Sequence, residues 1–264
     1  MKEKPVLVFI HGMFCTEKVF SSLAKFFKQN GFTVMAVRLP FHDVLIGEQP
    51  PAELGTTSIL DYVEYLKEIV IKINSEYILL GHSMGGLICS KLVSQPDINP
   101  KGMVLLAPAV PRWVIALKPS VLKSFKNIIT TKNFWNRAIH MSFEEICYSM
   151  LNMVPDEDRL QIYRCLTYES GRAGFELGFW AFDTRKATKL NYKNITCPIV
   201  VFAGTEDNIT PVSVISDFVK KLDKKSPAPI SFHVLEGKGH WLVTELDPQL
   251  ILEEIEKIIE TEEK

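Results

Sequence analysis

The chain has 264 residues and a formal net charge of −1, with 47% hydrophobic and 23% charged residues. This composition is that of an ordinary globular protein, and its balanced charge excludes the strong single-sign field that typically accompanies nucleic-acid binding. We therefore expect no nucleic-acid partner. The length fits one α/β domain that carries an insertion.

The amino-terminal residues and the cysteines indicate the compartment. The apolar run at residues 6–10 is too short for the hydrophobic region of a signal peptide, and no apolar stretch reaches the length of a membrane span. The five cysteines are an odd number without the spacing of a disulfide framework. We expect a cytoplasmic protein with free thiols and no integral membrane segment.

Motifs for cofactors are missing from the sequence. It contains no H-E-x-x-H, no C-x-x-C and no histidine cluster, so a metal site has no support. It also lacks the G-x-G-x-x-G and P-loop patterns that bind nucleotides. We expect no cofactor, and the sequence leaves the oligomeric state open.

Short apolar runs alternate with segments of helical period along the chain. The runs lie at residues 6–10, 33–37, 77–80, 103–107, 199–203 and 230–235. Because strands separated by helices form βαβ units, this order predicts an α/β fold with a mainly parallel six-stranded sheet and helices on both faces. The runs lack apolar/polar alternation, which is typical of strands covered on both faces.

Three helices have clear boundary signals. The first has Thr16 as a candidate N-cap and Gly31 where a C-terminal stop is expected. The second is predicted at roughly residues 58–74, and the last opens at Asp247, followed by Pro248 at the first helical position. These helices fill the connections that a parallel sheet needs.

The segment at residues 108–189 differs from the rest, because it shows helical patterns and many aromatic residues but no strand run. In open parallel sheets the ligand site lies beyond the carboxyl ends of the strands, where an insertion would cover it. We predict a core domain of residues 1–107 and 190–264 and a helical cap of residues 108–189. Most of its aromatic residues are expected to pack the cap against the core, and some to line an apolar pocket.

Four lysines of this segment are candidates for contact with an anionic lipid surface, although a charged helix face is more commonly just solvated. They are Lys118, Lys123, Lys126 and Lys132.

The stretch Gly81-His82-Ser83-Met84-Gly85-Gly86 follows one of the apolar runs and precedes a helical pattern. Its glycines leave room for a sharp turn that pushes the Ser83 hydroxyl outward. Gly-Ser-Gly clusters also occur in plain turns, but the strand before and the helix after favour a nucleophile elbow of the G-x-S-x-G type. We predict Ser83 as the nucleophile.

A serine needs a base to take its proton and a third group to hold that base. Among the six histidines, His240 lies in a glycine-rich loop after the last strand, from which an imidazole can reach the elbow. His82 is attached to Ser83 through the elbow itself and is hard to swing onto the hydroxyl. We predict His240 as the base, and either Glu206 or Asp207, in the turn after residues 199–203, as the acid.

Backbone N–H groups are expected to stabilise the developing oxyanion. One belongs to Met84, the residue after the nucleophile. The second is expected from Met13, in the loop after the first strand, where Gly12 allows an unusual backbone conformation.

Together these residues resemble the α/β-hydrolase superfamily over nearly the whole chain. The matching stretches are His11-Gly12, the elbow, Gly204-Thr205-Glu206-Asp207 with Pro211, and Gly239-His240. The superfamily's G-x-x-D pattern implies that Asp207 and not Glu206 is the acid. His240-Trp241 and Glu169-Ser170-Gly171-Arg172 look like the esterase, lipase and lysophospholipase members.

Two departures from the superfamily pattern are visible. The first strand of this chain corresponds to what is usually the third, so a six-stranded core is expected. Arg38-Leu39-Pro40-Phe41-His42 replaces the usual Asp-x-x-Gly-His, which leaves the role of that loop open.

The resemblance implies cleavage of a carboxylic ester with an apolar acyl or aryl group through an acyl-enzyme, with Ser83, His240 and Asp207 as the triad. Thioester hydrolysis, carbon–carbon bond hydrolysis and lyase chemistry can use the same triad and stay as alternatives. A non-catalytic binding protein on the same scaffold is a further alternative, although such a protein has no need of all three groups.

Overall fold

The computed structural model of the chain describes residues 4–116 and 118–260. Its centre is a six-stranded sheet in the order β2-β1-β3-β4-β7-β8, in which every neighbouring pair is parallel. The strands are β1 Val6–Ile10, β2 Val34–Val37, β3 Tyr77–His82, β4 Gly102–Leu106, β7 Ile199–Gly204 and β8 Ile230–Leu235. The predicted parallel six-stranded sheet is therefore confirmed.

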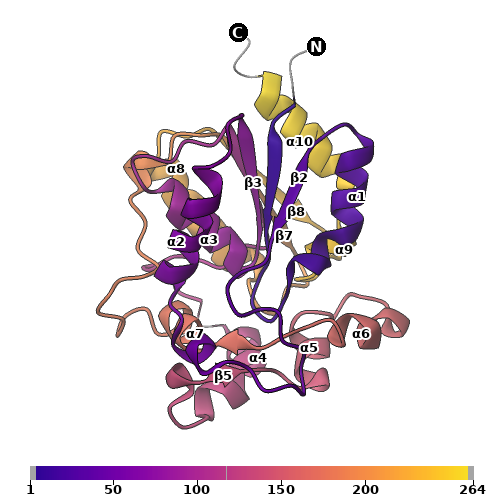
Figure 1. Ribbon diagram of the computed structural model, residues 1–264, viewed down its shortest axis with the longest axis vertical. Coiled ribbons are helices and arrows are strands. Elements are labelled where there is room, and N and C mark those ends of the chain that lie inside the picture. The colour runs from indigo at the N-terminus through magenta and orange to yellow at the C-terminus, as the bar shows by residue number, and fades with distance from the viewer. Residues whose placement is uncertain (1–3, 117, 261–264) are drawn as a thin grey trace.

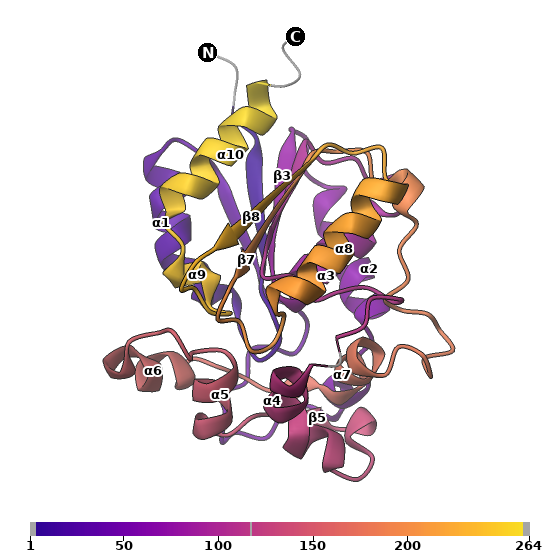
Figure 2. The same ribbon diagram turned by 180° about the vertical axis from the view of Figure 1, so that it is seen from behind.

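Helices cover both faces of the sheet (Figures 1 and 2). One face carries α1 Ser21–Gln29 and α10 Pro248–Glu260, with the short α9 Leu242–Glu245 beside them; the other carries α2 Ile59–Val70, α3 Met84–Val93 and α8 Val212–Lys225. Successive residues of a strand serve opposite layers, so Leu7 and Phe9 pack toward α1 and α10 while Val8 packs toward α2 and α3.

Burial separates the inner strands from the edges. The strands β3, β4 and β7 are almost wholly buried, whereas β2 and β8 carry exposed residues such as Met35 and Val234. The expectation of strands covered on both faces is thus wrong for β2 and β8, because each lies at an edge and has a neighbouring strand on one side only.

The helix boundaries follow the predicted signals with small differences. Thr16 caps a short 3₁₀ helix, η1 Glu17–Phe20, that leads into α1, and Asp247 accepts a hydrogen bond from the Gln249 N–H at the start of α10. Helix α2 has a capping box at Ser58 but ends at Val70, earlier than predicted. The N–H groups of Lys72 and Ile73 bond three residues back, and this tighter turn ends the helix.

Residues 108–189, which we call the insertion, lie at the end of the sheet opposite to the chain termini (Figures 1 and 2). They form α4 Pro119–Thr130, η3 Phe134–Asn136, α5 Phe143–Ser149, α6 Asp156–Tyr163 and α7 Gly171–Gly178. They also contain a two-residue antiparallel pair, β5 Ala138–Ile139 with β6 Glu169–Ser170, which the sequence did not indicate because such short strands leave no apolar run. Besides η1, the 3₁₀ helices η2 Ala52–Thr56 and η4 Tyr192–Asn194 lie outside it. Within the described residues, no helix has the length and apolarity needed to cross a membrane.

Candidate active site

Ser83 lies at the sharp turn between β3 and α3. Its backbone has φ 53° and ψ −122°, a conformation that strains any residue with a side chain. Gly81 and Gly85 permit the turn, because a Cβ on Gly81 would lie 2.6 Å from the Gly85 backbone and a Cβ on Gly85 would collide with the Ile10 carbonyl oxygen. The glycines of the motif are therefore a steric requirement for the position of Ser83.

His240 joins the predicted nucleophile to the predicted acid. Its Nε2 lies 3.0 Å from the Ser83 Oγ, so the serine O–H donates to it, and its Nδ1–H donates to the Asp207 Oδ2 at 2.8 Å. All three side chains are buried. The structure thus brings together the three residues that the sequence assigned to one site.

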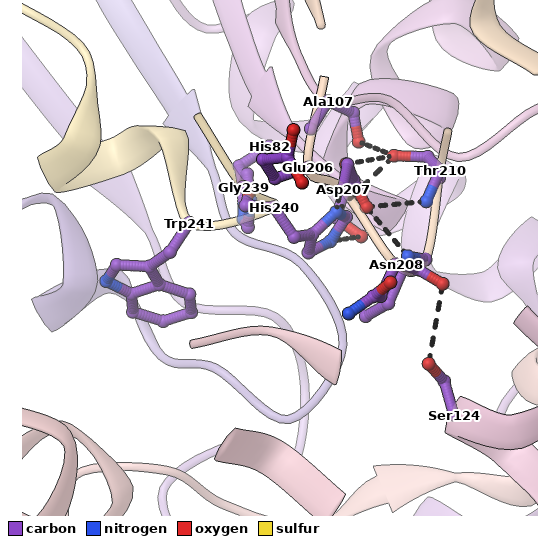
Figure 3. A network of polar contacts seen from close by, with 12 residues as sticks. His82, Ala107, Ser124, Glu206, Asp207, Asn208, Thr210, Gly239, His240 and Trp241 are labelled. Carbon is purple, nitrogen blue, oxygen red and sulfur yellow. Dashed lines mark hydrogen bonds and ion pairs between the residues drawn. The ribbon is translucent and has the colours of Figure 1, made fainter. Parts of the chain in front are cut away.

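Asp207 is held by four donors (Figure 3). Its Oδ1 accepts the N–H groups of Ile209 and Thr210 at 2.7 and 2.8 Å, and its Oδ2 lies 2.8 Å from the Thr210 hydroxyl, besides the imidazole. Burial alone would raise the pKa of Asp207, but the His240 imidazole and these hydrogen bonds lower that pKa below its usual value. Glu206, the other carboxylate considered from the sequence, is exposed.

Two further residues fix the backbone that carries the imidazole. The carboxylate of Glu245 accepts the N–H groups on both sides of His240, from Gly239 at 2.6 Å and from Trp241 at 3.1 Å. His82 donates its Nε2–H to the His240 carbonyl oxygen at 2.9 Å. Burial, followed by the nearby His240, lowers the pKa of His82 to about 3, so this ring stays neutral.

The loop after β1 packs directly on the serine. A Cβ on Gly12 would lie 2.8 Å from the Ser83 Cβ, so only a glycine fits between them. Met13 follows Gly12, and Met84 is the first residue of α3, whose N–H has no acceptor within the helix. Gly12 and Ser83 therefore lie against each other, and Met13 and Met84 are the residues that follow them in the chain. The role of Met13 and Met84 in an oxyanion hole remains a prediction.

The loop whose role the sequence left open, residues 38–42, is hydrogen-bonded to His11, a buried histidine in the loop after β1. Leu39 N–H donates to His11 Nε2 at 3.1 Å, while His11 Nδ1–H donates to the Gly12 carbonyl oxygen at 2.9 Å. Burial and the neighbouring His42 lower the pKa of His11 well below its usual value, which keeps the ring neutral. His11 therefore fixes the backbone at Gly12 to the loop after β2.

His42 ties the same loop to the insertion. Its Nδ1 faces the Pro40 carbonyl oxygen at 2.9 Å and its Nε2 faces Glu169 Oε2 at 3.1 Å, so both ring nitrogens act as donors. Burial by itself lowers the pKa of His42, but the charge of Glu169 and its hydrogen bond outweigh burial and raise that pKa overall. The Glu169 carboxylate also accepts from the Tyr62 hydroxyl and the Ser170 N–H, at 2.8 and 2.7 Å.

Sequence reasoning missed Thr210, Glu245 and Tyr62, and it gave Glu169 no role beyond its place in the esterase-like stretch Glu169-Ser170-Gly171-Arg172. Thr210 follows Asp207 within a turn, where an aspartate commonly accepts from the next N–H groups, and this local signal was available. The other contacts depend on the tertiary fold and leave no pattern in the sequence. Among the described residues, no group of three or more His, Cys, Asp or Glu side chains is arranged to hold a metal ion.

Comparisons with known proteins agree with this fold. The model of the Hydrolase_4 family, described as serine aminopeptidase, S33, matches residues 1–247. A Mycoplasma genitalium protein named "Putative esterase/lipase 2" is 23% identical over 241 residues, which cover 90% of this chain and 83% of that one.

Solved structures show the same architecture. Polyneuridine aldehyde esterase superimposes with a TM-score of 0.70 at 17% identity, covering 97% of this chain and 99% of its own. The monoacylglycerol lipase of Paleococcus ferrophilus gives a TM-score of 0.68 at 19% identity, covering 97% and 96%. The chain belongs to the Hydrolase_4 family of the α/β-hydrolase superfamily.

Proposed function

We propose that the protein is a serine hydrolase that cleaves carboxylic esters with an apolar acyl or aryl group through an acyl-enzyme. The observation that carries this proposal is the buried chain of hydrogen bonds from the Ser83 hydroxyl through His240 to Asp207. Family membership and the relative named for esterase and lipase activity support it.

In the acylation step, Ser83 Oγ bonds to the ester carbonyl carbon while its proton moves to His240 Nε2. The resulting oxyanion accepts hydrogen bonds from the N–H groups of Met13 and Met84. When the carbon–oxygen bond of the leaving group breaks, His240 gives its proton to the departing alcohol. A water then attacks the acyl-enzyme with His240 as base, releasing the acid and regenerating Ser83. Throughout, Asp207 keeps the tautomer of His240 fixed and stabilises its positive charge.

The insertion acts as a cap in this proposal, over a core of residues 1–107 and 190–264. Its helix α7 reaches the oxyanion loop, because a Cβ on Gly174 would lie 3.6 Å from Met13 Cε and from Ile139 Cδ1. Phe134, Phe175 and Phe179 pack against each other beside this helix. The apolar side chains on α7 and next to it support a substrate with an apolar acyl or aryl group.

Peptide cleavage from an amino terminus, which the family description suggests, fits less well. An aminopeptidase must pair the substrate ammonium with an acceptor, and a buried carboxylate of the insertion is the natural candidate. Among the described residues, Glu169 already accepts hydrogen bonds from His42 and Tyr62, and Glu176 accepts from the Ser58 hydroxyl and the Ile59 N–H. Asp183 accepts backbone N–H groups within its own turn. Ester cleavage is therefore the better match.

The test is a panel of p-nitrophenyl esters of graded acyl length, with lysophospholipids, acyl-CoA thioesters and aminoacyl p-nitroanilides as further arms. We expect turnover of the esters and a fall of roughly 10⁴-fold or more in kcat for Ser83→Ala. Faster turnover of acyl-CoA than of any ester would identify a thioesterase instead. No turnover of any ester or lysophospholipid would contradict the proposal.

A further inference from the structure

The stretch around α4 has an unusual charge pattern. Between Asp97 and Glu144 the sequence contains no aspartate or glutamate, while it contains Lys101, Arg112, Lys118, Lys123, Lys126, Lys132 and Arg137. The last five of these cations are exposed. The stretch therefore presents an excess of positive charge in a protein whose overall charge is close to zero.

The same stretch exposes large apolar side chains, each between 36% and 66% exposed. They are Trp113, Ile115, Leu122, Ile129 and Trp135. Leu122 and Ile129 are seven residues apart in α4 and thus lie on the same side of that helix. We call the outer side of α4, with Leu122, Ile129, Lys123, Lys126, the N-cap Lys118 and Lys132 just after the helix, the basic apolar face.

The opposite side of α4 packs on the candidate active site. Ser124 and Ile128 are buried, and the Ser124 hydroxyl reaches the Asn208 carbonyl oxygen at 3.4 Å, as Figure 3 shows. Asn208 directly follows Asp207. The basic apolar face is therefore the outer side of a helix whose inner side touches the turn of the candidate acid.

Carboxylates of the neighbouring helices α5 and α6 offset part of this charge. Helix α5 begins with Glu144 and Glu145, and the latter already accepts from the Asn127 amide at 2.6 Å and the Ser142 N–H at 2.7 Å. The acidic first turn of α6 lies beyond α5 in both views of Figures 1 and 2. Helix α4 lies in the insertion, at the end of the molecule opposite to the termini, and its Leu122 and Ile129 side chains are 47% and 37% exposed.

We propose that the basic apolar face binds the surface of an anionic lipid bilayer. Leu122 and Ile129 enter the boundary between headgroups and acyl chains, while the lysines of the face pair with anionic headgroups. A nucleic acid would pair with the cations but would not bury the apolar surface of Leu122 and Ile129, whose removal from water is favourable. This proposal stands apart from the proposed catalytic function, although it would place the candidate active site beside a lipid surface.

The first experiment is co-sedimentation with vesicles of phosphatidylglycerol or of phosphatidylcholine. We expect the wild type to bind phosphatidylglycerol vesicles at low ionic strength and to be released as salt is raised, because the Debye length falls to about 3 Å at 1 M. Binding to phosphatidylcholine vesicles should be at least tenfold weaker. Equal binding to both vesicle types, or no binding to phosphatidylglycerol, would overturn the proposal.

Charge variants localise the effect. Lys126→Glu with Lys132→Glu should weaken partitioning at least tenfold, because each lysine near an anionic surface contributes about fivefold. The matched control, Lys28→Glu with Lys72→Glu, makes the same change in net charge at exposed positions near the far ends of α1 and α2. It should change partitioning by less than about threefold, since a charge that distant is screened. Equal losses in the two variants would overturn the assignment to this face.

Apolar variants separate a lipid surface from a general polyanion. Leu122→Ser with Ile129→Ser should weaken binding to phosphatidylglycerol vesicles about tenfold and leave the melting temperature within a few degrees, as the two side chains are exposed. Vesicle binding unchanged in this variant, together with equally tight binding of the wild type to a single-stranded oligonucleotide, would overturn the lipid assignment. The readouts are partitioning and melting temperature, so failure of the ester panel leaves this test intact.

Discussion

Two buried clusters in this protein contain the same three chemical groups in a different order. In the first, the imidazole of His240 lies between the Ser83 hydroxyl and the Asp207 carboxylate. In the second, the carboxylate of Glu169 lies between the Tyr62 hydroxyl and the His42 imidazole. Composition and burial are alike, so the difference in order decides what each cluster does.

The order determines which atom is free to accept a proton. His240 uses Nδ1–H as a donor to Asp207 and keeps the Nε2 lone pair directed at the serine proton. His42 has acceptors on both nitrogens, Pro40 and Glu169, and is left with no lone pair for chemistry. The first cluster is therefore built for proton transfer, while the second joins the core to the insertion through a charge pair.

Matched substitutions of His240 and His42 give the largest expected difference in activity between the two clusters. His240→Gln should lower kcat/KM by roughly 10⁴-fold or more, because no base remains for the serine. His42→Gln should keep kcat/KM within about tenfold but lower the free energy of unfolding by about 3–5 kcal/mol, since Glu169 is left buried without its partner. Ester kinetics and urea unfolding measure the two effects. A greater loss of activity in the His42 variant would show that the comparison is wrong.

Asp207→Asn should reduce kcat by about 10⁴-fold at neutral pH without loss of the fold. The asparagine oxygen can accept the N–H groups of Ile209 and Thr210, which leaves its amide facing His240 Nδ1 and favours the tautomer whose Nε2 is already protonated. Glu206→Gln, one residue away and exposed, serves as the control and should change kcat by less than about twofold. Similar losses in both variants would contradict the assignment of the acid.

The pH dependence of stability tests the second cluster. The pKa of His42 is raised in the folded state, so its charge contributes stability that is fully present below the unfolded pKa of about 6.5. This contribution is lost as the pH rises through the folded pKa. Glu169→Gln should therefore lower the free energy of unfolding by about 1–3 kcal/mol more at pH 5.5 than at pH 9.

Tyr62→Phe is the matched control for that measurement. This substitution removes one hydrogen bond to the Glu169 carboxylate but keeps its pair with His42. It should lower the free energy of unfolding by about 1–2 kcal/mol at both pH values. Burial, followed by Glu169, raises the pKa of Tyr62 well above its usual value, so the phenol does not titrate in this range. A Glu169→Gln effect as flat with pH as that of Tyr62→Phe would show that His42 carries no charge.

The smallest expected effect concerns the loop that carries His240, the proposed base. Glu245→Gln should lower kcat about tenfold with little change in KM, because the amide can accept only one of the two N–H groups around His240 and misplaces the ring. Glu236→Gln, an exposed residue in the preceding turn, is the control. A change confined to KM would mean that Glu245 affects binding and not the position of the base.

Much of the fold and of the first cluster could be predicted because the signals are local. Apolar runs specify buried strands, and the glycines around Ser83 report a steric limit that the structure shows directly. The choice of His240 followed from its loop at the carboxyl edge. Asp207 and Glu206 could not be separated on residue type alone, and only the resemblance to a family distinguished them.

The second cluster could not be predicted, because its members come together only through the tertiary fold. His42 and Glu169 are 127 residues apart, and the stretches that contain them do not indicate that the two side chains meet. The exposure of β8 could not be predicted either, because the order of strands in the sheet, and not composition, decides which strand lies at an edge. Contacts that depend on the docking of the insertion leave the sequence without a periodic or motif signal.

Labelling with a fluorophosphonate probe tests most directly the claim that the protein environment makes Ser83 reactive. The account predicts that the wild type gains one phosphonyl adduct, located at Ser83 by mass spectrometry of the digested protein. The adduct should vanish in Ser83→Ala and form far more slowly in His240→Gln. A wild type that stays unlabelled, or a Ser83→Ala variant that is still labelled at the wild-type rate, would contradict it.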